Sequence, residues 1–132
     1  MAASSLHRLA CAMLVSLAAG SGCTGLSERQ CAEADWHQLG YMAGSGCVRS
    51  EHFDEHVDRC SQYGIEPNRA LYAEGYREGL STYCTVKSGF REGQAGRAYF
   101  GVCPVGQEPQ FLRAYRLGRE LNELGREIER VL

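Results

Sequence analysis

The segment His52-Phe53-Asp54-Glu55-His56 has the spacing in this chain that most suggests chemistry. It matches H-x-x-E-H, a pattern in which two histidines one helical turn apart bind zinc and the glutamate acts as a general base in peptidases. Such an enzyme needs a further protein ligand and a substrate cleft, for which a chain of 132 residues leaves little room. We therefore expect His56 to pack on the inner face of a helix, His52 to be exposed, and neither residue to hold a metal.

Cys47 is a second candidate, because it lies in a glycine-rich turn and a thiol can act as a nucleophile. Three alternatives remain open for it: a reactive thiol, an intermolecular disulfide, and a small buried residue. No neighbour in the sequence completes a catalytic dyad with it, and a low thiol pKa would be needed for reactivity.

Trp36 and the seven tyrosines form a third candidate set, since aromatic side chains could line a groove for a glycan or a lipid. In a small glycine-rich domain, tyrosines more often form the core with their hydroxyls at its rim. The sequence thus favours a structural or interaction module with no enzymatic activity and no cofactor. One alternative is a small-ligand binder, and the other is a zinc hydrolase that uses His52, Glu55 and His56.

Residues 1–22 have the pattern of a signal peptide, with a polar start and an apolar run that is too short to span a membrane. Small residues before Cys23 fit either ordinary signal peptidase or a degenerate bacterial lipobox, in which Cys23 becomes lipidated. Polar, glycine-containing residues follow Cys23, so we favour lipidation, with a tether over 23–30 and a single domain over 31–132. We expect an exported protein anchored in the cell envelope, at the periplasmic side of the outer membrane in preference to the inner membrane.

The charge of the chain argues against a nucleic-acid partner. Residues 1–22 contain one arginine and no acidic residue, so 13 basic and 16 acidic side chains remain after their removal, a net charge of −3. The arginines alternate with glutamates and form no basic stripe of the kind that contacts phosphates. The expected partners are the membrane, through the lipid anchor, and a protein at the C-terminal helix.

Periodicity predicts an all-α bundle of about five helices. The predicted helices run from about Asp35 to Ala43, from Glu51 to about Tyr63, over Leu71 to Cys84 after a start signal at Pro67 and Asn68, near Phe90 to Tyr99, and from Glu108 onward. Ser27 to Gln30 has capping-box spacing. Ser50 is expected to cap the second helix, and Gly64 is expected to end it.

The helix over Leu71 to Cys84 carries two glycines, Gly75 and Gly79, on its apolar face. Each glycine inside a helix costs about 1 kcal/mol relative to alanine, so an offsetting gain is needed. Close approach of a neighbouring backbone supplies such a gain. Glycines and aromatic residues recur in the other predicted helices at irregular intervals, which indicates a reused packing device and not a solenoid repeat.

The last predicted helix is long and amphipathic. Its predicted apolar face comprises Phe111, Tyr115, Gly118, Leu121, Gly125, Ile128 and Leu132. We expect its first half to cover the core. For the rest, two interpretations stand: solvated last turns, or a docking surface from Leu121 to Leu132 for a partner or a second copy.

Outside the signal segment and Cys23, the chain has five cysteines, an odd number for an exported protein in which thiols are normally oxidised. Two disulfides and one spare cysteine fit this number. If the first two helices form an antiparallel pair, Cys31 and Cys60 lie at the same end and are predicted to be bonded, with roughly 3 kcal/mol from loop closure. Cys84 then pairs with Cys103 by elimination.

A set of residues spread from Cys31 to Leu121 carries a family resemblance. The set comprises Asp35-Trp36, Leu39-Gly40-Tyr41, His56, Cys60, Gly64, Pro67, Tyr72, Gly75, Gly79-Leu80, Tyr83-Cys84, Gly89-Phe90, Gly93, Gly96, Tyr99, Gly101-Val102-Cys103-Pro104, Phe111, Tyr115 and Gly118. In combination these residues resemble a family of small Gram-negative envelope lipoproteins known as domain of unknown function 2799.

The resemblance implies a proteobacterial envelope protein and lipidation at Cys23, and it implies no activity. It also implies that the structural cysteines are Cys31, Cys60, Cys84 and Cys103. This chain has Ala43 and Asn68 where the family commonly shows aspartate, so a ligand role of the aspartate at either position does not carry over. Cys47 is particular to this chain.

Overall fold

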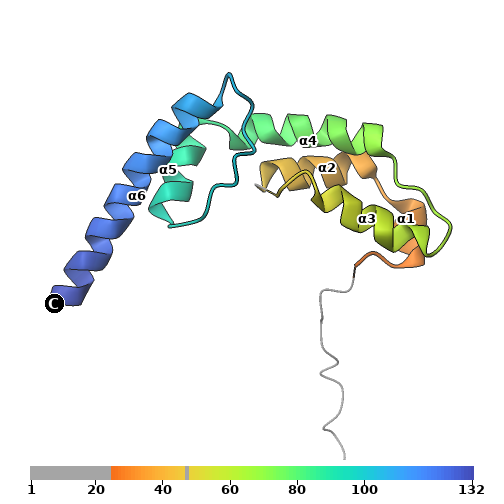
Figure 1. Cartoon of the computed structure of the whole chain (residues 1–132), viewed down its shortest axis with the longest axis horizontal. Coiled ribbons are helices and arrows are strands. Elements are labelled where there is room, and N and C mark those ends of the chain that lie inside the picture. The colour runs from red at the N-terminus through yellow and green to blue at the C-terminus, as the bar shows by residue number, and fades with distance from the viewer. Residues whose placement is uncertain (1–24, 47) are drawn as a thin grey trace, which may run out of the picture.

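The computed structural model describes residues 25–46 and 48–132, and this part of the chain is all-α (Figure 1). Its helices are α1 (Glu28–Glu33), α2 (Trp36–Ser45), α3 (His52–Ser61), α4 (Arg69–Tyr83), α5 (Val86–Gln94) and α6 (Glu108–Val131). The predicted fold class is therefore confirmed, including the two disulfides and the long C-terminal helix. The predicted signal segment, Cys23 and Cys47 lie outside the described residues.

Side-chain caps mark the starts of α1, α2, α4 and α5. The side chain of Asp35 accepts a hydrogen bond from the backbone of Gln38 at the start of α2, and Asn68 accepts one from Leu71 at the start of α4. The capping box that begins at Ser27 is also present. It starts a separate helix, α1, whose six residues are too few to show a helical period in the sequence.

Both predicted bounds of one helix and the predicted cap of another are wrong. The helix predicted near 90–99 is α5, which ends at Gln94 because Gly96 follows with a φ of 69° and turns the chain. It begins earlier than predicted because the side chain of Thr85 caps it. Ser50 does not cap α3, whose first turn has no side-chain cap, although Gly64 follows that helix with a φ of 70° as expected.

Helices α2 and α4 lie side by side, and their backbones touch at glycines (Figure 1). Each of four glycines has a carbonyl oxygen of the opposite helix where its Cβ would be: Gly40 that of Tyr72, Gly44 that of Tyr76, Gly75 that of His37, and Gly79 that of Tyr41. Residue numbers rise together along both helices, so the two helices run parallel. The close backbone approach predicted for Gly75 and Gly79 is confirmed.

Helices α5 and α6 repeat this contact. A carbonyl oxygen of the opposite helix again lies where a glycine Cβ would be: that of Phe111 at Gly89, that of Tyr115 at Gly93, and that of Phe90 at Gly118. When the two pairs are aligned on these contacts, Phe111 in the second pair is equivalent to Tyr72 in the first, and Tyr115 is equivalent to Tyr76. The packing device inferred from the sequence is thus a repeated pair of parallel helices.

A tyrosine hydrogen bond also recurs in both helix pairs. The Tyr76 hydroxyl donates to the carbonyl oxygen of Val48 at 2.8 Å, and the Tyr115 hydroxyl donates to that of Arg97 at 2.7 Å. In each pair the acceptor lies shortly after the first helix ends. The tyrosine therefore ties the chain leaving the first helix to the second helix.

Each helix pair has one disulfide at the end where both of its helices begin. Cys31 is bonded to Cys60 beside α2 and α4, and Cys84 is bonded to Cys103 beside α5 and α6. Each disulfide is buried in a core cluster of its own pair. One cluster contains Cys31, Trp36, Ala43, Phe53, Cys60 and Tyr72, and the other contains Leu80, Tyr83, Cys84, Cys103, Phe111 and Tyr115.

These are the cysteine pairs that the sequence predicts, but the physical reason is different. Helix α2 packs along α4, and it meets α3 through the ring of Trp36, which lies edge-on to the rings of Phe53 and His56. Cys31 and Cys60 meet because α1 and α3 both end near the start of the parallel pair (Figure 1). The antiparallel packing of the first two predicted helices is thus not what brings them together.

Only the first half of α6 covers the core. Its buried residues are Phe111, Ala114, Tyr115 and Gly118, while Leu121, Gly125, Ile128 and Leu132 from the predicted apolar face are exposed. The helix passes the end of α5 where the Asn122 side chain donates to the carbonyl oxygen of Gln94. Beyond that point α6 projects past its partner helix (Figure 1).

The backbone contact at Gly75 makes a direct prediction about stability. Gly75→Ala should lower the free energy of unfolding by about 3 kcal/mol, because the new methyl group has to displace the backbone of α2. Gly125 is the matched control, since it lies in a helix with open space around it, and Gly125→Ala should raise stability by about 1 kcal/mol. Urea unfolding of both variants measures the difference. A stabilising Gly75→Ala would show that the backbones do not need glycine.

Candidate functional site

The H-x-x-E-H segment has contacts that account for its side chains. The Nδ1 atom of His52 lies 2.9 Å from a carboxylate oxygen of Glu55 on the same helix. The ring of His56 packs between the rings of Trp36 and Tyr72, with centroids 5.9 and 6.0 Å away. The expected inward position of His56 is confirmed, and the two histidines and Glu55 do not form a convergent three-ligand group among the described residues.

A different set of residues brings three metal-ligating atoms together within the described part of the chain. His37 on α2 and Glu74 and Glu78 on α4 place one ligand atom each within 4.8 Å of the others. The Nε2 atom of His37 lies 3.3 Å from a carboxylate oxygen of Glu78, and the side chains are largely exposed. The contact of His37 with Glu78 is an ordinary surface interaction, and exposed acidic groups such as Glu74 are common without a metal.

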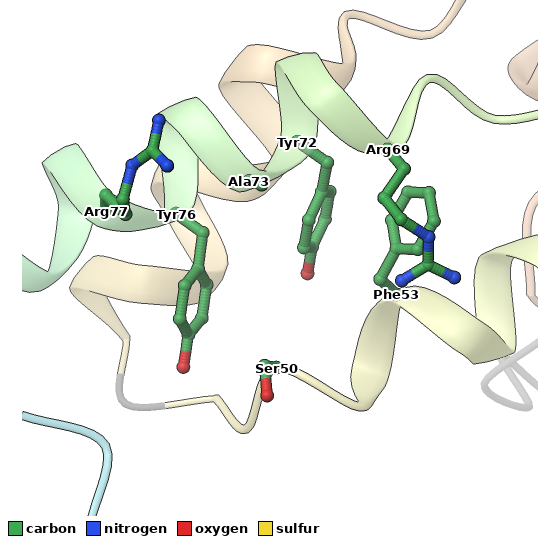
Figure 2. A pocket seen from close by; sticks show the side chains of 7 residues that line it. All are labelled: Ser50, Phe53, Arg69, Tyr72, Ala73, Tyr76 and Arg77. Atoms are coloured by element: carbon green, nitrogen blue, oxygen red, sulfur yellow. The ribbon is translucent and has the colours of Figure 1, made fainter.

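A pocket opens between α4 and the loop that leads into α3 (Figure 2). We call it the Tyr72 pocket; its lining residues are Ser50, Phe53, Arg69, Tyr72, Ala73, Tyr76 and Arg77. Its volume is about 180 Å³, and most of its lining is apolar. Figure 2 shows the hydroxyl groups of Tyr72 and Tyr76 pointing from α4 toward the Ser50 loop.

Tyr72 is the buried residue of this pocket. Its side chain is 3% exposed, and its ring lies 4.8 Å from that of Phe53 and 6.4 Å from that of Tyr76. Burial raises the pKa of Tyr72 to about 12, and the neighbouring Tyr76 and Glu55 contribute in the same direction. Its hydroxyl is buried without a hydrogen-bond partner among the described residues.

Arg69 and Arg77 supply the positive charge of the pocket. The Arg69 guanidinium lies over the ring of Phe53 at 4.4 Å and donates to a carboxylate oxygen of Asp54 at 2.9 Å. Arg77 is exposed, has no ion pair in the described part of the chain, and is turned away from the hydroxyl groups in Figure 2. The Tyr72 pocket therefore combines apolar walls, one unpaired buried hydroxyl and two arginines.

A second candidate surface is the exposed face of α6, which carries a continuous row of apolar side chains. We call this row the apolar stripe; it consists of Leu117, Leu121, Leu124, Ile128 and Val131, each between 49% and 76% exposed. These residues follow alternating steps of four and three, the spacing of a coiled-coil seam. The predicted apolar face named Leu121 and Ile128 but missed Leu117, Leu124 and Val131.

Two features of the structure are relevant to the cellular location of the protein: its disulfides and the composition of its helices. Disulfides persist in oxidising compartments outside the cytosol, so the two buried bonds fit an exported chain. Within residues 25–46 and 48–132, no helix is both long enough and apolar enough to cross a membrane. Cys23, the predicted lipidation site, lies outside the described residues, as does Cys47.

Sequence reasoning named the tyrosines and Trp36 as possible ligand contacts but did not find the pocket. Trp36 is buried beside α3 and does not line it. Arg69 was missed because its distance from Phe53 depends on how α3 folds back onto α4. In the sequence, Arg69 appears only as an arginine immediately after the helix cap Asn68. This position alone does not distinguish a pocket from a solvated surface.

The packing of His56 predicts a change of stability with pH. Burial lowers the pKa of His56 from 6.5, and the charge of His52 lowers it further, while Glu55 opposes both effects. The unfolded chain therefore binds more protons just below pH 6.5 than the folded chain does. Stability should be complete above pH 6.5 and should decline below it. Urea unfolding should show a weaker decline in His56→Gln than in the wild-type chain, whereas equal declines would contradict this account.

The comparisons with known proteins identify the family. No curated protein and no solved structure matches the chain significantly. The model of one family, described as "Protein of unknown function (DUF2799)", matches residues 35–120. This range begins at the cap of α2, contains all the glycine contacts of both helix pairs, and ends within α6. As the sequence resemblance implies, the chain belongs to the DUF2799 family.

Proposed function

We propose that this protein is a lipid-anchored component of the cell envelope that acts as an interaction module and not as an enzyme, binding a helix of another envelope protein along the apolar stripe of α6. The observation that carries this proposal is the stripe itself. Its five large apolar side chains cover the length from Leu117 to Val131, and each is about half exposed or more. Contiguous exposed apolar surface of this kind marks interaction sites.

The charges beside the stripe favour a protein partner over a lipid surface. From Arg116 to Arg130, α6 has four arginines and four glutamates. Interfacial membrane helices are usually rich in basic residues on their polar face, which attracts them to anionic lipids. The balanced charge of α6 provides no such attraction.

The same charges favour a different protein over a second copy. Glu120 and Glu127 flank the stripe on one side, and Gly125 lies on the other. Two antiparallel copies would bring the glutamates together, and two parallel copies would set them opposite uncharged residues, so neither arrangement gains an ion pair. A partner helix with basic residues beside its own apolar seam complements this face.

Sequence features support the anchor and the absence of catalysis. Small residues precede Cys23, and a polar, glycine-containing stretch follows it, as in a tethered lipoprotein. The H-x-x-E-H residues that suggested a zinc enzyme have other contacts: His52 lies against Glu55, and His56 packs against Trp36. The two disulfides fit a location in the oxidising envelope.

The lipid anchor predicts the fractionation of the protein. Cys23→Ala should move the protein from the membrane fraction to the soluble periplasmic fraction, because it removes the lipidated thiol. Immunoblotting of separated fractions measures the shift, with Cys47→Ala as the control that should stay in the membrane fraction. Unchanged partitioning of Cys23→Ala would refute lipid anchoring at this residue.

The docking surface predicts position-specific crosslinking in intact cells. A photo-crosslinking residue at Leu124 or Ile128 should yield a product with one other envelope protein, whereas the same residue at Arg126, on the opposite face of α6, should not. Leu124→Glu, combined with the probe at Ile128, should abolish the product while changing the free energy of unfolding by less than about 0.5 kcal/mol, since Leu124 is 60% exposed.

Two results would contradict this assignment. Equal crosslinking from Leu124 and Arg126 would show that the stripe has no special role. Crosslinks between two copies of the chain, together with a concentration-dependent dimer in analytical ultracentrifugation, would show that the stripe binds a second copy and not a different protein.

A further inference from the structure

The repeated helix pair shows which part of Tyr72 the fold requires. The register of the glycine contacts makes Phe111 its equivalent in the second pair, and Phe111 is fully buried with 0% exposure. Both rings pack into the cluster of their own pair. A phenylalanine therefore satisfies this position, and the hydroxyl of Tyr72 is not needed for packing.

The hydroxyl of Tyr72 is also costly to keep. It is buried and has no hydrogen-bond partner among the described residues, and an unpaired buried hydroxyl destabilises a fold relative to an apolar group of the same shape. Burial raises the pKa of Tyr72 to about 12, so the group is a neutral O–H donor at physiological pH. An unpaired donor at the edge of a pocket is a group available to a ligand.

The surroundings of this donor define the body of a ligand. Phe53 and Tyr76 contribute aromatic rings, and Ala73 contributes a methyl group. A cavity of about 150 Å³ lined by apolar side chains holds benzene, so a pocket of about 180 Å³ has room for a compact apolar body such as one ring. Helix α3 and the loop before it, which have no counterpart in the second helix pair, supply Phe53 and Ser50.

The charges of the pocket define the other end of the ligand. The hydrogen bond from Arg69 to Asp54 uses one nitrogen of the guanidinium, which has five N–H donors, so donors remain for a ligand. Arg77 adds a second positive charge without an ion pair in the described part of the chain. A carboxylate suits this setting, because it accepts hydrogen bonds from both a guanidinium and a phenol.

We propose that the Tyr72 pocket binds a small monocarboxylate with a compact apolar body, whose carboxylate accepts a hydrogen bond from the Tyr72 hydroxyl and faces Arg69. The apolar body lies against Phe53, Ala73 and Tyr76. Ser50 and Arg69 are exposed lining residues on either side of the hydroxyl, so their side chains can move to admit a ligand. This site is separate from the apolar stripe of α6 and does not depend on the partner proposed there.

The test uses 4-fluorobenzoate as the probe and ¹⁹F NMR line broadening with the purified full chain as the readout. We expect saturable binding of 4-fluorobenzoate, at least about fivefold weaker binding of the neutral 4-fluorobenzamide, and weaker binding still of 4-fluorotoluene, which lacks an acceptor. Tyr72→Phe should weaken binding of 4-fluorobenzoate at least about fivefold. Arg69→Gln should weaken binding of the carboxylate more than binding of the amide.

Stability measurements separate loss of the hydroxyl from loss of the fold. Tyr72→Phe should unfold at the same temperature as the wild-type chain or a higher one, because the hydroxyl that it removes is unpaired. Tyr115→Phe is the matched control: it should lower the unfolding temperature, because Tyr115 donates to Arg97, and it should leave binding of 4-fluorobenzoate unchanged.

Three results would overturn the proposal. One is an absence of saturable broadening of 4-fluorobenzoate by the wild-type chain at millimolar concentrations. Another is equal binding by the wild-type chain and Tyr72→Phe. The third is a fall in the unfolding temperature of Tyr72→Phe as large as that of Tyr115→Phe, which would show that the Tyr72 hydroxyl already has a structural partner.

Discussion

The structure depends on direct contact between the backbones of parallel helices. In both pairs a carbonyl oxygen of one helix occupies the place of a glycine Cβ on the other, so no side chain separates them. The apolar side chains therefore gather beside the contact, where each pair has its own small core. Parallel helices also need a return segment, which is α3 in the first pair and residues 95–107 in the second. Those return segments carry Cys60 and Cys103, and the disulfides fix them at the end where both helices begin.

Comparison of the two helix pairs separates what the shared fold requires from what each pair adds. Tyr76 and Tyr115 make the same hydrogen bond to the chain that leaves the first helix, so this bond belongs to the common plan. Tyr72 differs from its equivalent Phe111 by a hydroxyl alone. By the same register, Glu78, which pairs with His37, corresponds to Leu117 in the apolar stripe. A polar surface side chain of the first pair is thus replaced by an exposed apolar one in the second.

The sequence predicted features that depend on local chemistry, and it failed where the result depends on which elements meet. Glycines on an apolar helix face indicated backbone contact. The predicted cysteine pairs are present, although the antiparallel helix pair assumed for Cys31 and Cys60 is not what joins them, and Cys84 with Cys103 was predicted by elimination. Periodicity shows which face of a helix is buried but not its partner, so the pairing of α2 with α4 across α3 was not predictable. The Tyr72 pocket depends on that pairing. Two of the five stripe residues, Leu121 and Ile128, belonged to the predicted apolar face. The other three lie on an adjacent line of α6, which the core-facing residues Phe111, Tyr115 and Gly118 did not indicate.

The length of α6 is the clearest departure from the common plan. Helix α4 ends one turn after Gly79, but α6 continues for several turns after the equivalent Gly118, past the end of α5 (Figure 1). Nothing in the repeated packing requires this extension, since the glycine contacts and the buried residues of α6 all precede it. An uncovered apolar stripe lowers solubility, and the partner proposed above would give a physical reason to retain it. The first pair differs from the common plan in other features, α3 and the Tyr72 hydroxyl, which lie at the opposite end of the molecule from the extension of α6. A ligand in the pocket and a partner on α6 would therefore occupy separate surfaces, and either could be bound without displacing the other.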